Sequence, residues 1–224
     1  MDYRFLTTTP LFHGMSETEI KALLPCLSAR DKKYRKGSII YHAGNKVSEI
    51  GLILSGSVNI VVNFYWGSSN IFGHIGQGDI FAENYAAVPG RKLLNDVVAA
   101  ETTEVLFLNL NNLLTTCKKG CAFHNGIIHN LIKISAMKNL DLSSRMMHTA
   151  SKSIRERVLS YLSELAISSG SVHFTLPFSR QELADYLGVD RSALSNELSK
   201  MQKDGLIAFH KNDFTLLEDS YLYE

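Results

Sequence analysis

The sequence has few cysteines and no long apolar segment. Its three cysteines, Cys26, Cys117 and Cys121, are too few and too odd in number for a disulfide framework, which fits a reducing compartment. No hydrophobic run approaches the roughly 20 residues that a transmembrane helix requires. The first residues, MDYRFLTTTP, lack the basic region and apolar core of a secretion signal. We therefore expect a cytoplasmic protein with no membrane partner.

An excess of charge of either sign is also missing. The formal net charge of the 224 residues is +1. Residues 151–224 carry eight Lys and Arg residues against eleven Asp and Glu residues. A basic patch is the usual footprint of a nucleic-acid-binding domain. Any argument for DNA binding must therefore rest on one face of the protein rather than on its total charge.

Motifs of the common enzyme classes are absent as well. The sequence contains no phosphate-binding glycine loop, no nucleophile elbow and no histidine pair of the zinc-protease type. Most of the histidines are scattered without the spacing of metal ligands: His13, His42, His74, His129, His148 and His173. We therefore expect a protein that is not an enzyme.

The segment from about residue 36 to 109 has the pattern of a β domain. Short runs rich in β-branched and aromatic residues, such as Ile50–Leu54, Val58–Val62 and Val105–Leu108, alternate with glycine-containing turns. Many short strands at this spacing predict an all-β sandwich or roll.

A helical pattern follows from about residue 111 to 147. Ile127, Leu131 and Ile134 recur at the spacing of a helix–helix seam. A second copy of the chain is the partner we favour for this seam, and packing onto the chain's own β domain is the alternative. The polar residues 148–152 predict a hinge, which divides the chain into domains 1–147 and 148–224.

The C-terminal domain carries the signals of two short helices. Ser179 and Glu182 have the spacing of a capping box, and Gly188 is placed to end the first helix. Asp190 can then cap a second helix from Arg191 to about Lys203. Two short helices joined by such a tight turn predict a helix-turn-helix.

The second helix of this motif has two different faces. Leu194, Leu198 and Met201 form one apolar stripe, whereas the opposite side is polar and free of carboxylates. Such a slim polar face suits the major groove, where Arg191 is expected to bind guanine and Asn196 adenine. Residues 206–209 and 214–217 predict a β-hairpin wing. The alternative is a polar face that contacts only solvent. The predicted DNA-binding residues are Ser179, Arg180, Arg191, Ser192, Ser195, Asn196, Ser199, Lys203 and Lys211.

Two stretches of sequence resemble a known family. The segment FSRQELADYLGVDRSALSNELSKMQKDGLIAF is similar to the DNA-binding domain of the Crp/Fnr family, and KGSIIYHAG followed by LILSGSVNIV resembles its β-roll. The resemblance implies an α+β protein with an N-terminal double-stranded, jelly-roll-like β-roll, a long dimerisation helix and a C-terminal winged helix-turn-helix. It also implies a homodimer that binds an inverted-repeat operator in double-stranded DNA, with RNA polymerase as a further partner.

The base-reading positions match that family only in part. Arg191 stands where the Crp branch usually carries a base-reading arginine, and Ser195 matches a serine of the Fnr branch. Ser192 replaces a common glutamate, and Asn196 replaces a common arginine. The operator sequence therefore cannot be transferred from the resemblance.

The resemblance also implies that an effector binds in the β-roll and repositions the recognition helices. Ala82–Glu83 stands where cyclic-nucleotide-binding members have Gly-Glu, but Leu94 stands at the phosphate-binding arginine. A buried phosphate needs a cation or several amide donors, and Asp96 would repel it. We therefore expect an unidentified small effector and disfavour a cyclic nucleotide. The expected effector-binding residues are Glu83, Asn84, Tyr85, Leu94 and Asn95.

A second kind of sensor stays open. Cys117, Cys121 and His124 are spaced i, i+4 and i+7 and would share one side of a helix, so they are candidates for binding a metal or haem or for reacting with an oxidant. The competing interpretation, buried cysteines beside a surface histidine, is the one we favour, because a fourth ligand is missing. Four closely spaced thiolates for an iron–sulfur cluster are not present in one subunit. We assign no metal site.

Overall fold

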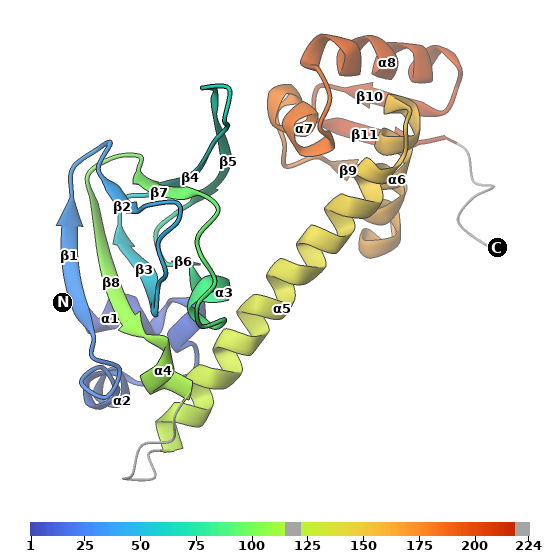
Figure 1. The fold of residues 1–224 in the computed structure, drawn as a ribbon. Helices are drawn as coiled ribbons and strands as arrows, with labels where there is room; N and C mark the ends of the chain where they lie inside the picture. Colours follow the sequence, from blue (N-terminus) through green and yellow to red (C-terminus); the bar gives the residue numbers. More distant parts are fainter. Residues whose placement is uncertain (115–121, 218–224) are drawn as a thin grey trace. The chain divides into compact units, whose positions relative to one another are not determined.

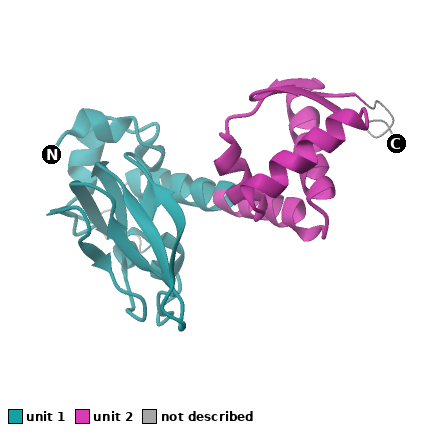
Figure 2. Ribbon diagram, turned by 90° about the horizontal axis from the view of Figure 1, so that it is seen from above, with its two compact units in different colours: residues 1–137 teal, residues 138–224 magenta. Residues whose placement is uncertain are grey.

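The computed structural model describes residues 1–114 and 122–217. Figure 1 shows the order of the elements along the chain, and Figure 2 shows the two compact units into which it divides, residues 1–137 and 138–224. The helix α5 (Ala122–Ala150) runs across both this division and the domain boundary expected at residue 147.

The first unit contains two antiparallel four-stranded sheets, which confirms the predicted β-roll. The strand order of one sheet is β1, β8, β3, β6: Arg30–Tyr34, Thr103–Asn109, Glu49–Ser55 and Ile80–Phe81. The order of the other is β2, β7, β4, β5: Ile39–Tyr41, Asp96–Ala99, Val58–Asn63 and Ser69–Ile75. Gly51 lies opposite Phe81, whose ring would be 2.1 Å from a Cβ at that position, so glycine is required there.

The first unit also contains short helices: α1 (Tyr3–Thr7), η1 (Pro10–Phe12), α2 (Glu17–Leu23), α3 (Glu83–Ala86) and α4 (Leu110–Leu114). Apolar residues from α1, η1 and α2 pack with β3, β8 and the start of α5 in one core cluster. A second cluster fills the space between the sheets, where the rings of Tyr41, Phe81 and Phe107 meet edge to face. The interior of the roll is therefore occupied by the protein's own aromatic side chains.

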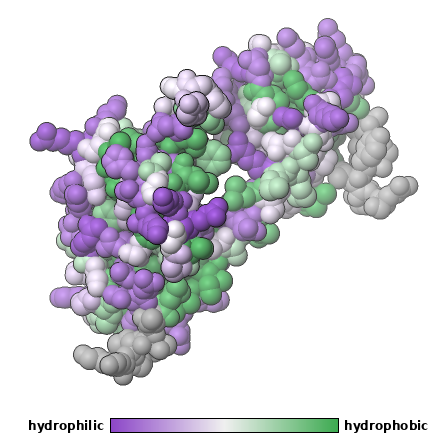
Figure 3. All heavy atoms as spheres, in the orientation of Figure 1, coloured by the Kyte–Doolittle hydropathy of each residue, from purple (hydrophilic) through white to green (hydrophobic). Residues whose placement is uncertain are grey.

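The predicted seam on the long helix is buried by the same chain. Ile127 and Leu131 belong to the first core cluster and Ile134 packs against it, so our preference for a partner chain at these positions was wrong. The spacing of apolar residues is the same for either kind of burial, and therefore the pattern alone does not identify the partner. Other apolar side chains of α5 are exposed, and Figure 3 shows apolar atoms along this helix: Ile132, Met137, Leu140, Leu142, Met146 and Met147.

The hairpin formed by β4 and β5 exposes aromatic residues. Tyr65 and Trp66 are exposed at its tip, where Phe64 stacks on Trp66 at 4.7 Å, and Ile71 and Phe72 are exposed on β5. The strand β5 is the edge of its sheet. The sequence from residue 50 to 78 contains no Asp, Glu, Lys or Arg. This hairpin therefore exposes several apolar and aromatic side chains with no Asp, Glu, Lys or Arg among them.

The second unit consists of the end of α5, three helices and a small sheet. Its remaining elements are α6 (Ile154–Ser169), β9 (His173–Thr175), α7 (Arg180–Leu187), α8 (Arg191–Lys203), β10 (Ile207–His210) and β11 (Asp213–Leu216). The three strands are antiparallel in the order β10, β11, β9. Residues from all three helices and from the sheet form one core cluster, which includes Leu162, Leu183, Leu198 and Phe214.

The hinge predicted at residues 148–152 is shorter than expected. The helix α5 continues through Ala150, and the His148 side chain is buried. Ser153 then caps α6 by accepting a hydrogen bond from the Glu156 N–H.

Among residues 1–114 and 122–217, none of the helices combines the length and the apolar composition that crossing a bilayer requires.

Candidate nucleic-acid interface

The helix α7 begins at the predicted capping box. The Ser179 N–H donates to the Glu182 carboxylate at 2.7 Å, and the Glu182 N–H donates to the Ser179 hydroxyl oxygen at 3.3 Å. The hydrogen bond from the Ser179 backbone lowers the pKa of Glu182. At the other end, Gly188 has a φ of 64°, a left-handed conformation that glycine adopts readily. The turn between the two helices follows from these local signals.

Asp190 caps the next helix, as predicted. Its Oδ1 accepts hydrogen bonds from the N–H groups of Ser192 and Ala193 at 2.8 and 3.0 Å and from the Ser192 hydroxyl. These hydrogen bonds, above all the one from the Ser192 side chain, lower the pKa of Asp190. The carboxylate also sits favourably at the positive end of the helix dipole. The start of α8 is thereby fixed at Arg191.

The two faces of α8 are separated as the sequence predicts. Leu194, Leu198 and Met201 are fully buried in the core of the second unit. The opposite face exposes a set of polar and basic side chains: Arg191, Ser192, Asn196, Ser199 and Lys203. Ser195 is half-buried. The hydroxyls of Ser195 and Ser199 donate to carbonyls one turn earlier, which leaves their oxygen lone pairs as acceptors.

The acidic side chains nearest this face are paired. Arg155 of α6 contacts the Glu197 carboxylate at 2.7 Å and the Asp204 carboxylate at 2.6 Å. Glu182 and Asp190 are engaged as helix caps. Within the described residues, Arg191 and Lys203 form no ion pair with an acidic side chain. The acidic total of residues 151–224 therefore does not describe the outer face of α8.

The predicted wing is present and is anchored on two sides. Strands β10 and β11 form a hairpin, and β9 pairs with β11, while the Leu176 N–H donates to the Asn212 carbonyl at 2.8 Å. Lys211 lies at the turn with a φ of 56°, an uncommon conformation for a residue other than glycine. Its side chain is exposed. The turn therefore presents one cation beside α7.

Arg180 contacts the wing rather than projecting freely. Its Nη2 donates to the Lys211 carbonyl at 2.9 Å, and its guanidinium lies 5.4 Å from the ring centres of both Phe209 and Phe214. Burial lowers the pKa of this guanidinium. Among the predicted DNA-binding residues, Arg180 thus differs from the exposed Arg191 by being fixed to the hairpin.

The C-terminal end of α7 is bound by two arginines that sequence reasoning did not assign. Arg145 of α5 donates to the carbonyls of Asp185 and Tyr186, each at 3.0 Å. Arg157 of α6 donates to the carbonyls of Leu187 and Gly188 at 3.0 and 3.3 Å. Each of these hydrogen bonds joins residues that are 30 to 41 positions apart in the sequence. A single sequence carries no local signal for contacts at this separation.

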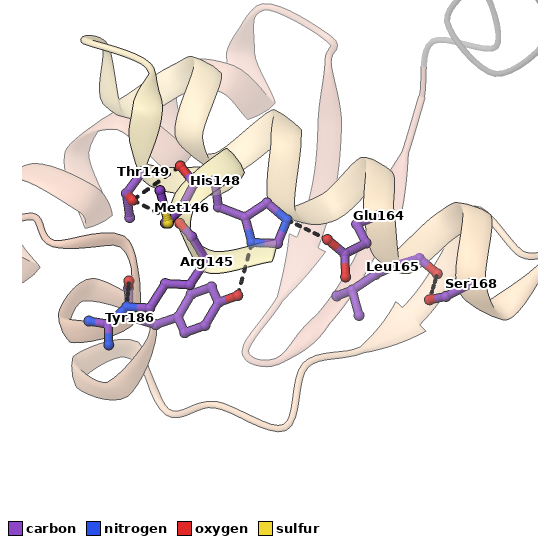
Figure 4. Close-up of polar contacts among 8 residues, drawn as sticks. All are labelled: Arg145, Met146, His148, Thr149, Glu164, Leu165, Ser168 and Tyr186. Carbon is purple, nitrogen blue, oxygen red and sulfur yellow. Dashed lines mark hydrogen bonds and ion pairs between the residues drawn. The ribbon is translucent and has the colours of Figure 1, made fainter. Parts of the chain in front are cut away.

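A buried histidine lies beside this helix end. Figure 4 shows His148 between Tyr186 and Glu164, with the Arg145 side chain next to the tyrosine ring. The His148 Nδ1 is 2.9 Å from the Tyr186 hydroxyl, and its Nε2 is 2.8 Å from the Glu164 carboxylate. The His148 side chain is 2% exposed. Three helices, α5, α6 and α7, therefore meet at one polar cluster.

The expected effector-binding residues have mixed environments. Glu83 is buried at the start of α3 and Asn84 is exposed, while Tyr85 and Asn95 are half-buried. The Leu94 side chain is 68% exposed, and its N–H donates to the Tyr85 hydroxyl at 3.4 Å. Tyr85 and Leu94 are thus joined by a hydrogen bond.

Asp96 follows directly after the expected effector-binding residues Leu94 and Asn95. The Asp96 carboxylate accepts hydrogen bonds from the Ala43 N–H and the Asn63 side-chain amide, both at 2.7 Å. Arg91 and Lys92 have exposed side chains. Ala82 has a φ of 64°, so the chain keeps the left-handed turn that glycine would form more easily.

The alternative sensor site cannot be described as a whole. Cys117 and Cys121 lie outside the described residues. His124 is buried, and its Nδ1 has no hydrogen-bond partner among the described residues. Within residues 1–114 and 122–217, no three His, Cys, Asp or Glu side chains are grouped as metal ligands would be.

Comparisons with known proteins agree with both units. Residues 156–223 match the family model of a Crp-like helix-turn-helix domain, and residues 31–119 match that of a cyclic nucleotide-binding domain. The chain is 24% identical to the cyclic AMP receptor protein of Thermus thermophilus over 96% of both chains. It is 23% identical to the transcriptional activator protein FnrL of Cereibacter sphaeroides, over 84% of this chain and 76% of that protein. The structure of CprK complexed with OCPA matches 88% of this chain and 92% of that one, with a TM-score of 0.63 and 17% identity.

Proposed function

Because the chain belongs to the Crp/Fnr family of transcription regulators, we propose that α8 enters the major groove of DNA and reads bases through Arg191 and Asn196. The observation that carries this proposal is the outer face of α8, which is exposed, polar and free of unpaired carboxylates. Arg191 can donate two hydrogen bonds to guanine, and Asn196 can pair with adenine in the same way. Ser192, Ser195 and Ser199 supply acceptors along the same face.

The remaining predicted residues hold the protein on the DNA backbone. Lys203 and Lys211 are exposed cations at the end of α8 and at the tip of the wing, where each can neutralise a phosphate. The N-terminus of α7, capped by Ser179, faces phosphate favourably through its free N–H groups. Arg180 acts by holding the wing, because its guanidinium already contacts the Lys211 carbonyl and two aromatic rings.

The regulator works as a homodimer. Among the exposed apolar side chains of α5, Ile132, Leu140 and Met147 lie on the side opposite to Ile127 and Leu131 and offer a surface to a second copy. Two-fold symmetry then places two recognition helices on an inverted repeat, with half-sites about one helical turn, or ~34 Å, apart. Bound to such an operator in the cytoplasm, the dimer would act on RNA polymerase.

The effector of the first unit is a small molecule other than a cyclic nucleotide. The position of the family's phosphate-binding arginine is occupied by the exposed Leu94, and the Asp96 carboxylate lies two residues away. A phosphate placed there would meet a negative charge instead of a cation. Glu83, Asn84, Tyr85 and Asn95 remain our proposed contacts, and ligand binding at the roll would reposition the two recognition helices of the dimer, each together with the end of its α5.

Selection of bound sequences from random double-stranded DNA tests this proposal. The full-length protein is incubated with the DNA pool in the presence and absence of a cell extract. We expect an inverted repeat to be enriched, more strongly when the extract supplies the effector. Enrichment of a single unrepeated site would contradict the symmetric dimer, and no enrichment under either condition would refute sequence-specific DNA binding.

A further inference from the structure

The end of α7 is more firmly held than a helix of its length requires. Gly188 already closes the helix by donating its N–H to the carbonyls of Ala184 and Asp185. The carbonyls of residues 185–188 nevertheless all accept hydrogen bonds from arginine, two from Arg145 and two from Arg157. A guanidinium is a rigid planar fork, so each arginine fixes a direction as well as a distance.

His148 adds a second link between α5 and α7. It is one turn after Arg145 on α5, and it contacts the Tyr186 hydroxyl with one ring nitrogen and the Glu164 carboxylate with the other. The Tyr161 ring of α6 packs edge-on against the imidazole at 5.4 Å. Both ring nitrogens thus have a polar neighbour in this buried site, the Tyr186 hydroxyl as a hydrogen-bond partner and the Glu164 carboxylate at the distance of an ion pair.

These contacts join the end of α5 to the recognition helix through a short path. Arg145 and His148 hold α7, and α7 packs against α8 in the shared core through Leu183, Leu187 and Leu194. All of these residues belong to the second unit. The direction of α8 is therefore fixed relative to the last three turns of α5, rather than being left to the short connection at residues 151–153.

From this arrangement we propose that Arg145 and His148 are positioning residues that determine the spacing between the two half-sites of the operator. The inference rests on the proposed function, in which α5 pairs with a second copy and α8 reads a half-site. In such a dimer the angle between α5 and α8 fixes the separation of the two recognition helices. One additional base pair moves a half-site by about 3.4 Å and turns it by about a tenth of a turn, so a rigid dimer tolerates few spacings.

A library of operators tests this inference. Each member carries the two half-sites enriched from random DNA, separated by spacers that differ one base pair at a time, and binding to the full-length protein is measured for each. For the wild type we expect one preferred spacing and about a tenfold loss of affinity at each neighbouring spacing. For Arg145→Lys, which keeps the charge but loses the fork, and for Tyr186→Phe, which loses only the hydroxyl, we expect neighbouring spacings to approach the affinity of the preferred one.

Two control variants separate positioning from other effects. Lys21→Ala removes an exposed cation from α2 of the first unit and should leave the spacing preference unchanged. Asn196→Ala should alter the preferred half-site sequence but not the spacing. A uniform loss of affinity at every spacing in Arg145→Lys and Tyr186→Phe would overturn the inference, since that is the result of lowered stability alone.

The outcome also distinguishes this inference from the proposed function. If the wild type enriches no inverted repeat, the proposed function is wrong. If the wild type has a strict spacing and both variants keep it, the function stands and the role of Arg145 and His148 is refuted. Tyr186→Phe removes a single oxygen from a partly exposed side chain, so we expect this variant to fold. It therefore tests the inference even if Arg145→Lys proves unstable.

Discussion

The two units place acidic side chains differently around the surfaces that we assign to ligands. Beside α8, Glu197 and Asp204 are paired with Arg155, and Asp190 is engaged as a helix cap. In the first unit, Asp96 lies on β7, two residues after Leu94, and its partners are a backbone N–H, an amide and the His42 Nδ1 at 4.0 Å. The first arrangement suits a polyanion such as DNA, whereas the second disfavours an anionic effector.

This difference shows that the net charge of a unit does not predict which ligands its surface can bind. The second unit is acidic by count, yet the exposed side chains along α8 are neutral or basic. The position of each carboxylate depends on caps and ion pairs formed with other elements. The following predictions test how independent the two surfaces are, beginning with the largest expected effect.

Leu198→Ala should destabilise the second unit most. This side chain is fully buried in the core behind α8, and truncation of a buried leucine costs about 2–5 kcal/mol of unfolding free energy. Chemical denaturation followed by circular dichroism should show the loss. The fluorescence of Trp66, the single tryptophan and a residue of the first unit, should keep its wild-type midpoint. A parallel shift of both signals would show that the two units unfold together.

Arg191→Ala and Asn196→Ala should weaken binding to the selected operator by about 1–3 kcal/mol each and relax the preference at one base pair per half-site. The affected base pair should be different for the two variants, because the residues lie more than one helical turn apart on α8. Binding to a panel of singly substituted operators gives this result directly. An unchanged base preference in either variant would refute that residue's assignment.

Arg155→Ala should weaken DNA binding without removing a DNA contact. The substitution leaves the carboxylates of Glu197 and Asp204 without their cation, and the affinity should fall several-fold at low salt. The double variant Arg155→Ala with Glu197→Gln should recover part of the loss. Failure of this rescue would show that Arg155 acts through packing rather than through the charges near α8.

Lys203→Ala should reduce affinity for all sequences about equally and lower the slope of log K against log salt by about 0.9, as expected for one lost phosphate contact.

Arg180→Lys makes the complementary change to Lys203→Ala, because it removes a structural contact and not a charge. It keeps a positive charge but loses the fork that holds the wing, so affinity should fall although one cation remains. If Arg180→Lys binds like the wild type, Arg180 is a phosphate contact rather than a support for the wing.

The smallest effect concerns acid stability. Each unit has a capping box, Ser16 with Glu19 on α2 and Ser179 with Glu182 on α7, and hydrogen bonds from the serine lower the pKa of both glutamates below 4.5. A carboxylate with a lowered pKa contributes stability that is complete above about 4.5 and is lost as the pH falls through the lower folded value. Glu182→Gln should flatten the acid dependence of the second unit alone, and Glu19→Gln that of the first. The unfolding midpoint of each unit should be measured for both variants between pH 5 and 3. An effect of either substitution on the other unit would contradict this prediction.

The features that were predictable from the sequence are those with local signals. The capping box at Ser179, the left-handed Gly188 and the cap at Asp190 each depend on residues no more than four positions apart, and all three are present. The contacts of Arg145, Arg155 and Arg157 join residues 30 to 49 positions apart and follow only from the tertiary fold. Arg180 belongs to the same class, since its position in the sequence predicted a contact with DNA while its partners are in the wing.

The hairpin of β4 and β5 has a consequence for handling the protein. Its edge strand exposes Ile71 and Phe72 and has no lysine, glutamate or proline to discourage pairing with another strand. The isoelectric point of about 7.8 gives the chain little repulsion near neutral pH. Concentrated solutions should therefore self-associate through this edge most readily between pH 7 and 8, and replacement of Phe72 by lysine is the first change to make when better solubility is needed.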